Sequence, residues 1–130
     1  MASEAPVFLD SSCLVALALD EPGAARLRAR IATAPSRSAS TLAEAELKSA
    51  LAREGKPLVS IPVPGLEWIA PARRLTRELT QVQEAGYVRG ADAWHIACAL
   101  FLDPAASELT FLSLDAQQRK VARAVGFRVA

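Results

Sequence analysis

The sequence predicts an α/β protein, a three-layer α/β/α sandwich around a mostly parallel central sheet. Short apolar runs that suit buried strands alternate along the chain with stretches that repeat apolar residues at helical spacing. Two of these runs, Val7–Leu9 and Leu109–Leu114, each lead directly into an aspartate and then a helical pattern. Parallel strands end along one edge of a sheet, and ligands bind in the crevice outside that edge. We therefore expect Asp10 and Asp115 to face each other across one pocket.

The composition favours a folded domain. The chain has 130 residues, 52% of them hydrophobic and 22% charged, and we expect a single domain spanning residues 1–130. No apolar run approaches the roughly 20 residues that cross a bilayer, and the first residues lack the pattern of a secretory signal. The net charge of +1 supplies no general attraction for polyanions. We expect no membrane partner.

The cysteines favour a reducing compartment. Cys13 and Cys98 both lie in apolar helical patterns and lack the spacing of metal ligands. Such positions are typical of buried free thiols, which persist in the cytoplasm. We therefore expect a cytoplasmic location.

The first half of the chain alternates between strand and helix patterns. The expected elements are strand Val7–Leu9, a helix that ends before the Asp20–Gly23 turn, helix Ala24–Thr33, a polar edge strand within Pro35–Ser40, and helix Leu42–Arg53. Thr41 is the expected N-cap of the last of these helices, because Glu44 follows it at the spacing of a capping box.

The second half continues the alternation after a loop rich in proline and glycine at Gly55–Gly65. The expected elements are strand Leu66–Ile69, an amphipathic helix that carries Leu75, Leu79 and Val82 and stops at Gly86, helix Ala91–Leu102 opened by Gly90, strand Leu109–Leu114, helix Ala116–Val125 followed by Gly126, and strand Phe127–Val129.

A third aspartate lies where a carboxylate is costly. The segment Ala91–Leu100 is apolar nearly all round, as a buried helix requires, and Asp92 lies in its first turn. A buried ionised carboxylate needs a paired charge, hydrogen bonds or a metal. The helix dipole or a salt bridge to Arg89 would each explain Asp92 alone. Taken together with Asp10 and Asp115 at strand ends, it favours a metal site.

A glutamate from another helix is the fourth candidate. Glu44 and Glu46 are two residues apart, so they point about 200° apart around the helix axis, and only one of them can face the pocket. Glu44 suits the capping role, which makes Glu46 the inward candidate. Spacing alone leaves the choice between them open.

These residue types favour a hard divalent cation. His95 is the only histidine, so the chain offers no Ser/His/Asp triad and no His/Cys zinc set. We expect His95 to be a satisfied core residue or a supporting residue rather than a catalytic base. No Walker A or dinucleotide glycine pattern is present. An oxygen-only set of acids suits Mg²⁺ or Mn²⁺, which activate water and stabilise charge on a phosphodiester.

Four segments of the chain form a recognisable set. They are Asp10-Ser11-Ser12, Glu46-Leu47 with Ala50-Leu51, Arg89-Gly90-Ala91-Asp92-Ala93-Trp94-His95-Ile96-Ala97, and Leu114-Asp115 with Ala122 and Gly126. In their order they resemble the four motifs of PIN-domain ribonucleases, and the group they are most similar to is the VapC-like toxins of bacterial toxin–antitoxin pairs. The resemblance covers essentially the whole chain, and its first and third motifs are the specific ones.

The resemblance implies a metal-dependent endoribonuclease that hydrolyses RNA phosphodiester bonds. Its catalytic acids would be Asp10, Glu46, Asp92 and Asp115. Asp10 and Asp92 would be the main ligands of one or two Mg²⁺ or Mn²⁺ ions, with Asp115 and Glu46 completing the site directly or through water. Ser12 would orient the first carboxylate. The implied partners are an RNA substrate, a second copy of the chain in a homodimer, and a cognate antitoxin protein that covers the pocket.

Other classes of protein fit less well. A phosphoacceptor receiver domain needs a second acid beside Asp10, and a haloacid-dehalogenase-type phosphatase needs an aspartate where Ser12 stands. A non-catalytic PIN-like module that binds RNA or protein is the main alternative, although all four acidic positions are filled. A PIN nuclease that matures RNA or acts on DNA would use the same chemistry.

Overall fold

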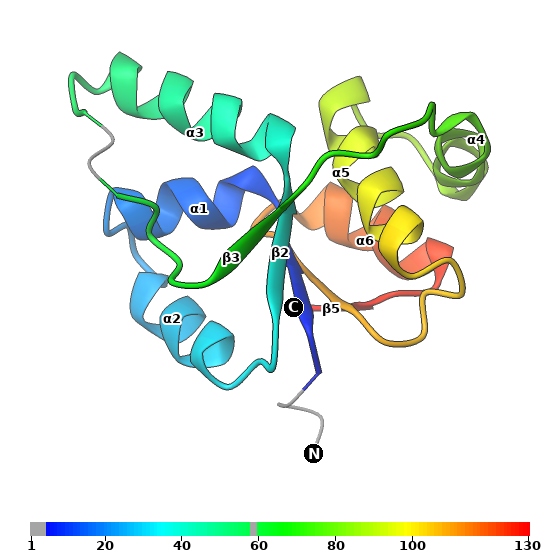
Figure 1. Cartoon of the computed structure of the whole chain (residues 1–130), viewed down its shortest axis with the longest axis horizontal. Coiled ribbons are helices and arrows are strands. Elements are labelled where there is room, and N and C mark those ends of the chain that lie inside the picture. Colours follow the sequence, from blue (N-terminus) through cyan, green and yellow to red (C-terminus); the bar gives the residue numbers. More distant parts are fainter. Residues whose placement is uncertain (1–4, 58–59) are drawn as a thin grey trace.

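In the part of the chain that the structure describes, the central sheet has five strands that all run parallel, in the order β3-β2-β1-β4-β5 (Figure 1). The structure is a computed structural model that describes residues 5–57 and 60–130. The strands are β1 (Val7–Leu9), β2 (Arg37–Ser40), β3 (Leu66–Ile69), β4 (Thr110–Leu112) and β5 (Arg128–Val129). The helices are α1 (Ser11–Ala18), α2 (Ala24–Ala32), α3 (Thr41–Arg53), α4 (Thr76–Ala85), α5 (Gly90–Leu102) and α6 (Ala116–Val125). Each connection between successive strands contains at least one helix, as parallel pairing requires.

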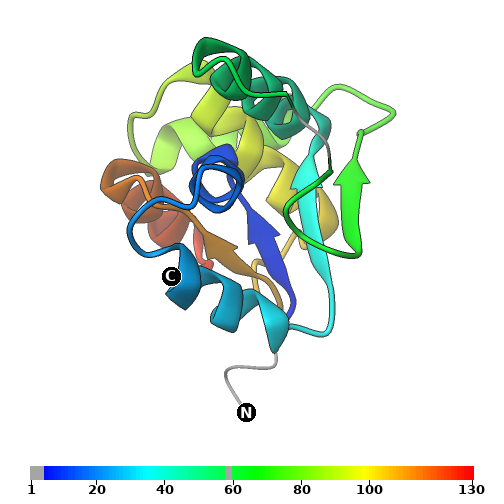
Figure 2. The same cartoon turned by 90° about the vertical axis from the view of Figure 1, so that its left-hand side faces the viewer.

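The helices form one layer on each face of the sheet. Helices α1, α2 and α3 lie on one face and α4, α5 and α6 on the other (Figure 1), and in Figure 2 the first layer faces the viewer with the strands behind it. The chain moves from β1 through β2 to β3 in one direction, then crosses back to β4 and β5. Right-handed crossovers that run in opposite directions lie on opposite faces. The topology therefore confirms the α/β/α sandwich predicted from the sequence.

The central strand β1 is buried on both of its faces. Val7 and Leu9 pack into the core beneath α1, α2 and α3, whereas Phe8 points to the opposite core, where its ring stacks on that of Phe111 with 5.8 Å between the centroids. A strand covered by helices on both faces needs apolar side chains at every position. This explains the uninterrupted apolar run that predicted the strand.

The prediction that the polar segment ending at Ser40 forms an edge strand is wrong. Strand β2 is internal, because it pairs with β1 on one side and with β3 on the other. Its polar side chains have partners inside the protein: the Ser38 hydroxyl donates to the Val7 carbonyl at 3.5 Å, and the Ser40 hydroxyl contacts His95 Nδ1 at 2.9 Å. The edge strand on this side is β3.

The capping box predicted for Thr41 and Glu44 is also wrong. Helix α3 begins one residue earlier than predicted, so its N-cap is Ser40, and no side chain caps it. The Ser40 hydroxyl would normally accept a hydrogen bond from the first turn. Here it is turned toward His95 instead.

Most other elements follow the predictions. Helix α6 has the predicted bounds, and Gly126 follows it with a φ of 129° that favours glycine. Strand β4 is shorter than predicted at both ends. Leu109 donates its backbone N–H to the Asp103 carboxylate, and Leu114 donates its own to the Ser12 hydroxyl. Residues 58–59 of the predicted loop Gly55–Gly65 lie outside the described residues.

The two cysteines are free and buried, as predicted. Cys13 belongs to the core beneath α1, α2 and α3, and Cys98 to the core on the opposite face. Burial raises the pKa of both thiols to about 12. Within residues 5–57 and 60–130, no helix has the length and apolarity needed to cross a membrane.

Candidate active site

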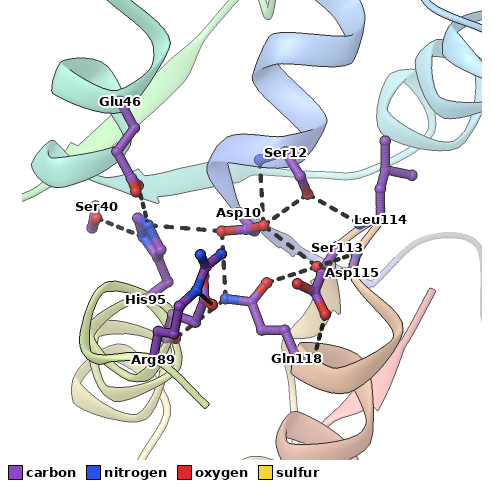
Figure 3. A network of polar contacts seen from close by, with 11 residues as sticks. Asp10, Ser12, Ser40, Glu46, Arg89, His95, Ser113, Leu114, Asp115 and Gln118 are labelled. Carbon is purple, nitrogen blue, oxygen red and sulfur yellow. Dashed lines mark hydrogen bonds and ion pairs between the residues drawn. The ribbon is translucent and has the colours of Figure 1, made fainter. Parts of the chain in front are cut away.

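Asp10 lies at the carboxyl end of the central strand, where the strand passes into α1. Its carboxylate is the N-cap of α1, and its side chain is only 5% exposed. Oδ2 accepts hydrogen bonds from the Ser12 hydroxyl at 2.7 Å and from the Ser12 backbone N–H at 3.3 Å. These bonds orient the carboxylate (Figure 3). The contact between Ser12 and Asp10 is the one expected from the sequence.

A buried serine and a buried glutamine lie on one side of Asp10. Ser113 follows strand β4, and its hydroxyl donates to Gln118 Oε1 at 2.6 Å. The Gln118 side-chain amide donates in turn to Asp10 Oδ1 at 3.4 Å and to the backbone carbonyl of Asp92 at 3.2 Å. Gln118 is completely buried. Its side chain therefore connects the end of β1 to the first turn of α5.

Asp115 is the N-cap of α6, and its Oδ1 accepts from the Gln118 backbone N–H at 3.0 Å. The loop before it is held by serines, because Leu114 N–H donates to the Ser12 hydroxyl and Asp115 N–H donates to the Ser113 hydroxyl, both at 3.0 Å. The ends of β1 and β4 are thus joined by side-chain hydrogen bonds. The order of the strands reverses between these two, which is where open α/β sheets bind ligands.

Asp92 lies in the first turn of α5 with its side chain 19% exposed. Burial raises the pKa of its carboxyl group above the usual range, and the negative charges of Asp10 and Asp115 raise it further. Arg89, whose Nε lies 3.6 Å from Asp92 Oδ2, and His95 lower it in part. The ion pair considered from the sequence is therefore present, but it does not outweigh burial and the neighbouring acids.

Glu46 projects from α3 into the same region, and the structure settles the choice between the two glutamates. Glu46 lines the cavity and its Oε1 lies 2.6 Å from His95 Nε2, whereas Glu44 is not among the lining residues. His95 is completely buried, and its Nε2 also lies 3.7 Å from Asp10 Oδ1. It is thus a satisfied buried residue that supports two of the acids, as expected from the sequence.

All four predicted acids line one cavity of about 790 Å³. They come from four parts of the chain, since Asp10 follows β1, Glu46 lies on α3, Asp92 lies on α5 and Asp115 precedes α6. Two arginines also line this cavity, Arg53 at the end of α3 and Arg89 before α5. The cavity therefore combines an acidic centre with cationic groups.

The donors of this cavity fit a hard divalent cation. Each acid supplies carboxylate oxygens, the ligands that Mg²⁺ and Mn²⁺ prefer. Burial, and then repulsion by the negative charges of Asp10 and Asp115, raise the pKa of Asp92. A cation among these oxygens would relieve that repulsion. Within the described part of the chain, no three acidic, histidine or cysteine side chains already form a compact set of metal ligands. The four carboxylates therefore share the lining of one cavity without forming such a set.

Sequence reasoning missed several residues of this site, among them Gln118, Ser40, Ser113 and Arg53. Gln118 lies in the first turn of an amphipathic helix, where the sequence pattern predicts a surface residue. Ser40 lies in a polar segment for which the pattern predicts an edge strand. A signal for Gln118 is its position three residues after Asp115, at which an N-cap carboxylate meets the backbone of the first turn. Its burial depends on the packing of α6 against the sheet, which no local pattern encodes.

The fold and the site define an α/β/α protein with an acidic cavity at the carboxyl edge of a parallel sheet. The chain belongs to the PIN domain family: the family model matches residues 7–124. The family is one of nuclease-type folds, and its nucleases typically depend on divalent metals. A comparison with curated protein sequences found no match.

Proposed function

We propose that this protein is a Mg²⁺- or Mn²⁺-dependent endoribonuclease. The observation that carries the proposal is the convergence of Asp10, Glu46, Asp92 and Asp115 on one cavity of a PIN domain. A chain that bound RNA or protein without catalysis would not need four acids in a cavity, because each of them repels phosphate and destabilises its neighbours. The completeness of the acidic set therefore favours catalysis over a binding module.

The proposed metal ligands are Asp10, Asp92 and Asp115, with Glu46 completing the site. When bound, the cation activates water and stabilises the negative charge that develops on the phosphodiester. Hydrolysis adds water across one P–O bond and leaves a phosphate on one fragment and a hydroxyl on the other. Ser12 and Gln118 orient Asp10 for this role.

The arginines of the cavity supply the complementary charge. Arg53 and Arg89 line the same space as the acids, and the Arg89 side chain is 79% exposed. A guanidinium group binds phosphate through two parallel hydrogen bonds. We expect these two side chains to contact phosphates that flank the cleaved bond, and thereby to align RNA over the acidic centre.

The proposed biological role is that of a VapC-like toxin of a toxin–antitoxin pair. It rests on the resemblance of the four motifs to that group, foremost Asp10-Ser11-Ser12 and the segment from Arg89 to Ala97. The proposed partners are an RNA substrate, a cognate antitoxin and a second copy of the chain, and the proposed location is the cytoplasm. Induction of the chain should arrest growth, and co-expression of a small protein encoded beside it should restore growth.

The catalytic proposal is tested by replacing single acids. Asp10→Asn and Asp92→Asn should each abolish Mg²⁺- or Mn²⁺-dependent cleavage of RNA, because each change removes a negative charge from the cation site. Cleavage is followed on a mixture of cellular RNAs, with the ends sequenced so that activity and substrate are read together. A DNA strand of matched sequence shows whether the activity is specific for RNA.

The matched control is Asp20→Asn, since Asp20 is an exposed aspartate in the turn after α1 and does not line the cavity. This variant should cleave like the wild type. Circular dichroism of all three variants checks that the fold persists. Unchanged cleavage in both Asp10→Asn and Asp92→Asn would exclude this site, and RNA binding without turnover in the wild type would favour the non-catalytic module.

A further inference from the structure

His95 is the only histidine of the chain, and it lies completely buried between two polar side chains. Its Nδ1 lies 2.9 Å from the Ser40 hydroxyl, and its Nε2 lies 2.6 Å from Glu46 Oε1. Figure 3 shows the three side chains in a row, with Asp10 beside the ring. Because they come from β2, α5 and α3, the row links three elements at the edge of the cavity.

The carboxylates beside His95 determine that its Nε2 carries a proton. An ionised carboxylate only accepts hydrogen bonds, so the short contact with Glu46 requires a proton on Nε2. Asp10 Oδ1, 3.7 Å from the same nitrogen, also favours a proton there. The Ser40 hydroxyl can donate or accept, so it forms a hydrogen bond with Nδ1, 2.9 Å away, whichever of the two atoms carries the hydrogen.

Ser40 occupies the N-cap position of α3 without capping the helix. Serine is favoured at N-caps because its hydroxyl accepts from the first turn, a contact worth about 1 kcal/mol. In this protein the hydroxyl contacts His95 instead, and α3 begins without a side-chain cap. The same helix carries Glu46 in its second turn. Ser40 at the start of α3 and Glu46 within α3 thus contact different nitrogens of the same imidazole ring.

We propose that Ser40 is a positioning residue that acts through His95 on Glu46. The Ser40 hydroxyl holds the ring through Nδ1, and the N–H at Nε2 holds the Glu46 carboxylate at the wall of the acidic cavity. The role of Glu46 in metal binding and cleavage rests on the proposed function. The hydrogen bonds of His95 with Ser40 and Glu46 do not rest on the proposed function, and they can be measured in a protein that shows no enzymatic activity.

Nitrogen NMR of the imidazole tests the arrangement of protons directly. Because the chain has a single histidine, its two ring nitrogens give signals that need no separation from those of other histidines. The wild type should show a proton on Nε2 and a hydrogen bond at Nδ1. An Nε2 without a proton, or an Nδ1 without a hydrogen bond, would overturn the proposal.

Ser40→Ala removes the hydroxyl that contacts Nδ1, and Ser38→Ala is its matched control. Both serines are buried in β2, but the Ser38 hydroxyl contacts the Val7 carbonyl and not the imidazole. Ser40→Ala should shift the Nδ1 signal, weaken Mn²⁺ binding measured by calorimetry about 10-fold, and lower kcat by a similar factor with little change in KM. Ser38→Ala should retain wild-type values in all three measurements. Equal effects of the two variants would contradict the proposal.

A double variant tests whether Ser40 acts through Glu46. Glu46→Gln should itself weaken Mn²⁺ binding, and adding Ser40→Ala to it should weaken binding by less than about twofold more, because coupled residues do not contribute additively. Additive losses would show that Ser40 acts by another route and would overturn the proposal. A wild type that neither binds Mn²⁺ nor cleaves RNA would refute the proposed function, while the NMR result still decides the proton arrangement.

Discussion

The two oxygens of the Asp10 carboxylate differ in how well the protein satisfies them. Oδ2 accepts the short bond from the Ser12 hydroxyl at 2.7 Å, whereas Oδ1 has only longer contacts, with Gln118 at 3.4 Å and with His95 at 3.7 Å. Lone pairs that accept weak bonds are the ones available to a cation. We therefore expect Oδ1 to bind the metal and Oδ2 to hold the carboxylate in place.

Replacement of Gln118 tests whether this buried amide positions the acids. Gln118→Ala removes the donor to Asp10 and to the Asp92 carbonyl, and it leaves the Ser113 hydroxyl with only its longer contact to Asp10 Oδ2 at 3.4 Å. The free energy of unfolding should fall by roughly 1–3 kcal/mol, and Mn²⁺ affinity should fall about 10-fold. Denaturant titration and calorimetry measure the two effects.

The control for this change is Gln81→Ala, which removes an exposed glutamine from α4 on a helix away from the cavity. This variant should keep the free energy of unfolding and the Mn²⁺ affinity near their wild-type values. A loss of stability in Gln118→Ala with unchanged Mn²⁺ affinity would show that Gln118 supports the fold and not the acids.

At the residue scale, the sequence predicted acids that line one cavity in the structure, but it did not predict the residues that hold them. Asp10, Asp92 and Asp115 are identifiable because a charge beside a buried strand or on an apolar helix conflicts with its surroundings. Gln118 and Ser40 are uncharged, and the residues next to them in the sequence do not make a polar side chain unexpected there. Their partners Asp10 and His95 are distant in sequence, so only the folded chain shows why these polar groups are buried.

At the scale of elements, the turn between α5 and β4 is organised by one carboxylate. Asp103 accepts backbone N–H bonds from Ser107, Glu108 and Leu109 at distances between 2.8 and 3.3 Å. Burial opposes ionisation of Asp103, but these three donors outweigh it, and the pKa of the carboxyl group lies below its usual range. The turn therefore depends on an ionised Asp103.

Asp103→Asn should lower the free energy of unfolding at pH 7 by roughly 1–3 kcal/mol, because the uncharged amide offers a single, weaker acceptor. A folded-state pKa below the unfolded value of about 3.9 means that the contribution is present above that pH and is lost as the pH falls below it. Urea titrations at pH 7 and near pH 3 should show the difference between variant and wild type narrowing in acid. A difference that stays constant would exclude ionisation as its source.

The bounds of helices and strands were easier to predict from the sequence than the order of the strands in the sheet. The bounds of β1, β3 and α6 follow from apolar spacing and from turn residues at their ends. The wrong prediction of an edge strand for β2 has a physical cause. Polar side chains normally mark exposed positions, but the hydroxyls of Ser38 and Ser40 find hydrogen-bond partners within the protein.

At the scale of the whole molecule, one sheet separates two cores, and each core contains one cysteine. Cys13 lies on one face and Cys98 on the other, and burial raises the pKa of each thiol to about 12. The strand β1 contributes alternate side chains to both cores. Loss of one core should therefore destabilise the other.

Thiol labelling in increasing urea tests this coupling. In the native protein at pH 8 neither cysteine should react with an alkylating reagent, because a buried thiol with a raised pKa supplies almost no thiolate. Both should become reactive at the same urea midpoint, as a cooperative two-state transition requires. Mass spectrometry of the labelled peptides follows each site in the wild type. Separate midpoints would show that the two layers unfold independently.

The pairing of β1 with β4 brings together two ends of the described chain, so it determines at what stage of synthesis the acidic cavity can form. Val7 lies beside Thr110 in the sheet, and the carboxylate of Asp10 is held by Ser113 and Gln118, which are synthesised near the other end of the described chain. During translation, Asp10 leaves the ribosome long before its partners exist. The cavity therefore assembles only after α6 has been made, so the growing chain stays without a complete acidic centre beside the ribosome that is producing it.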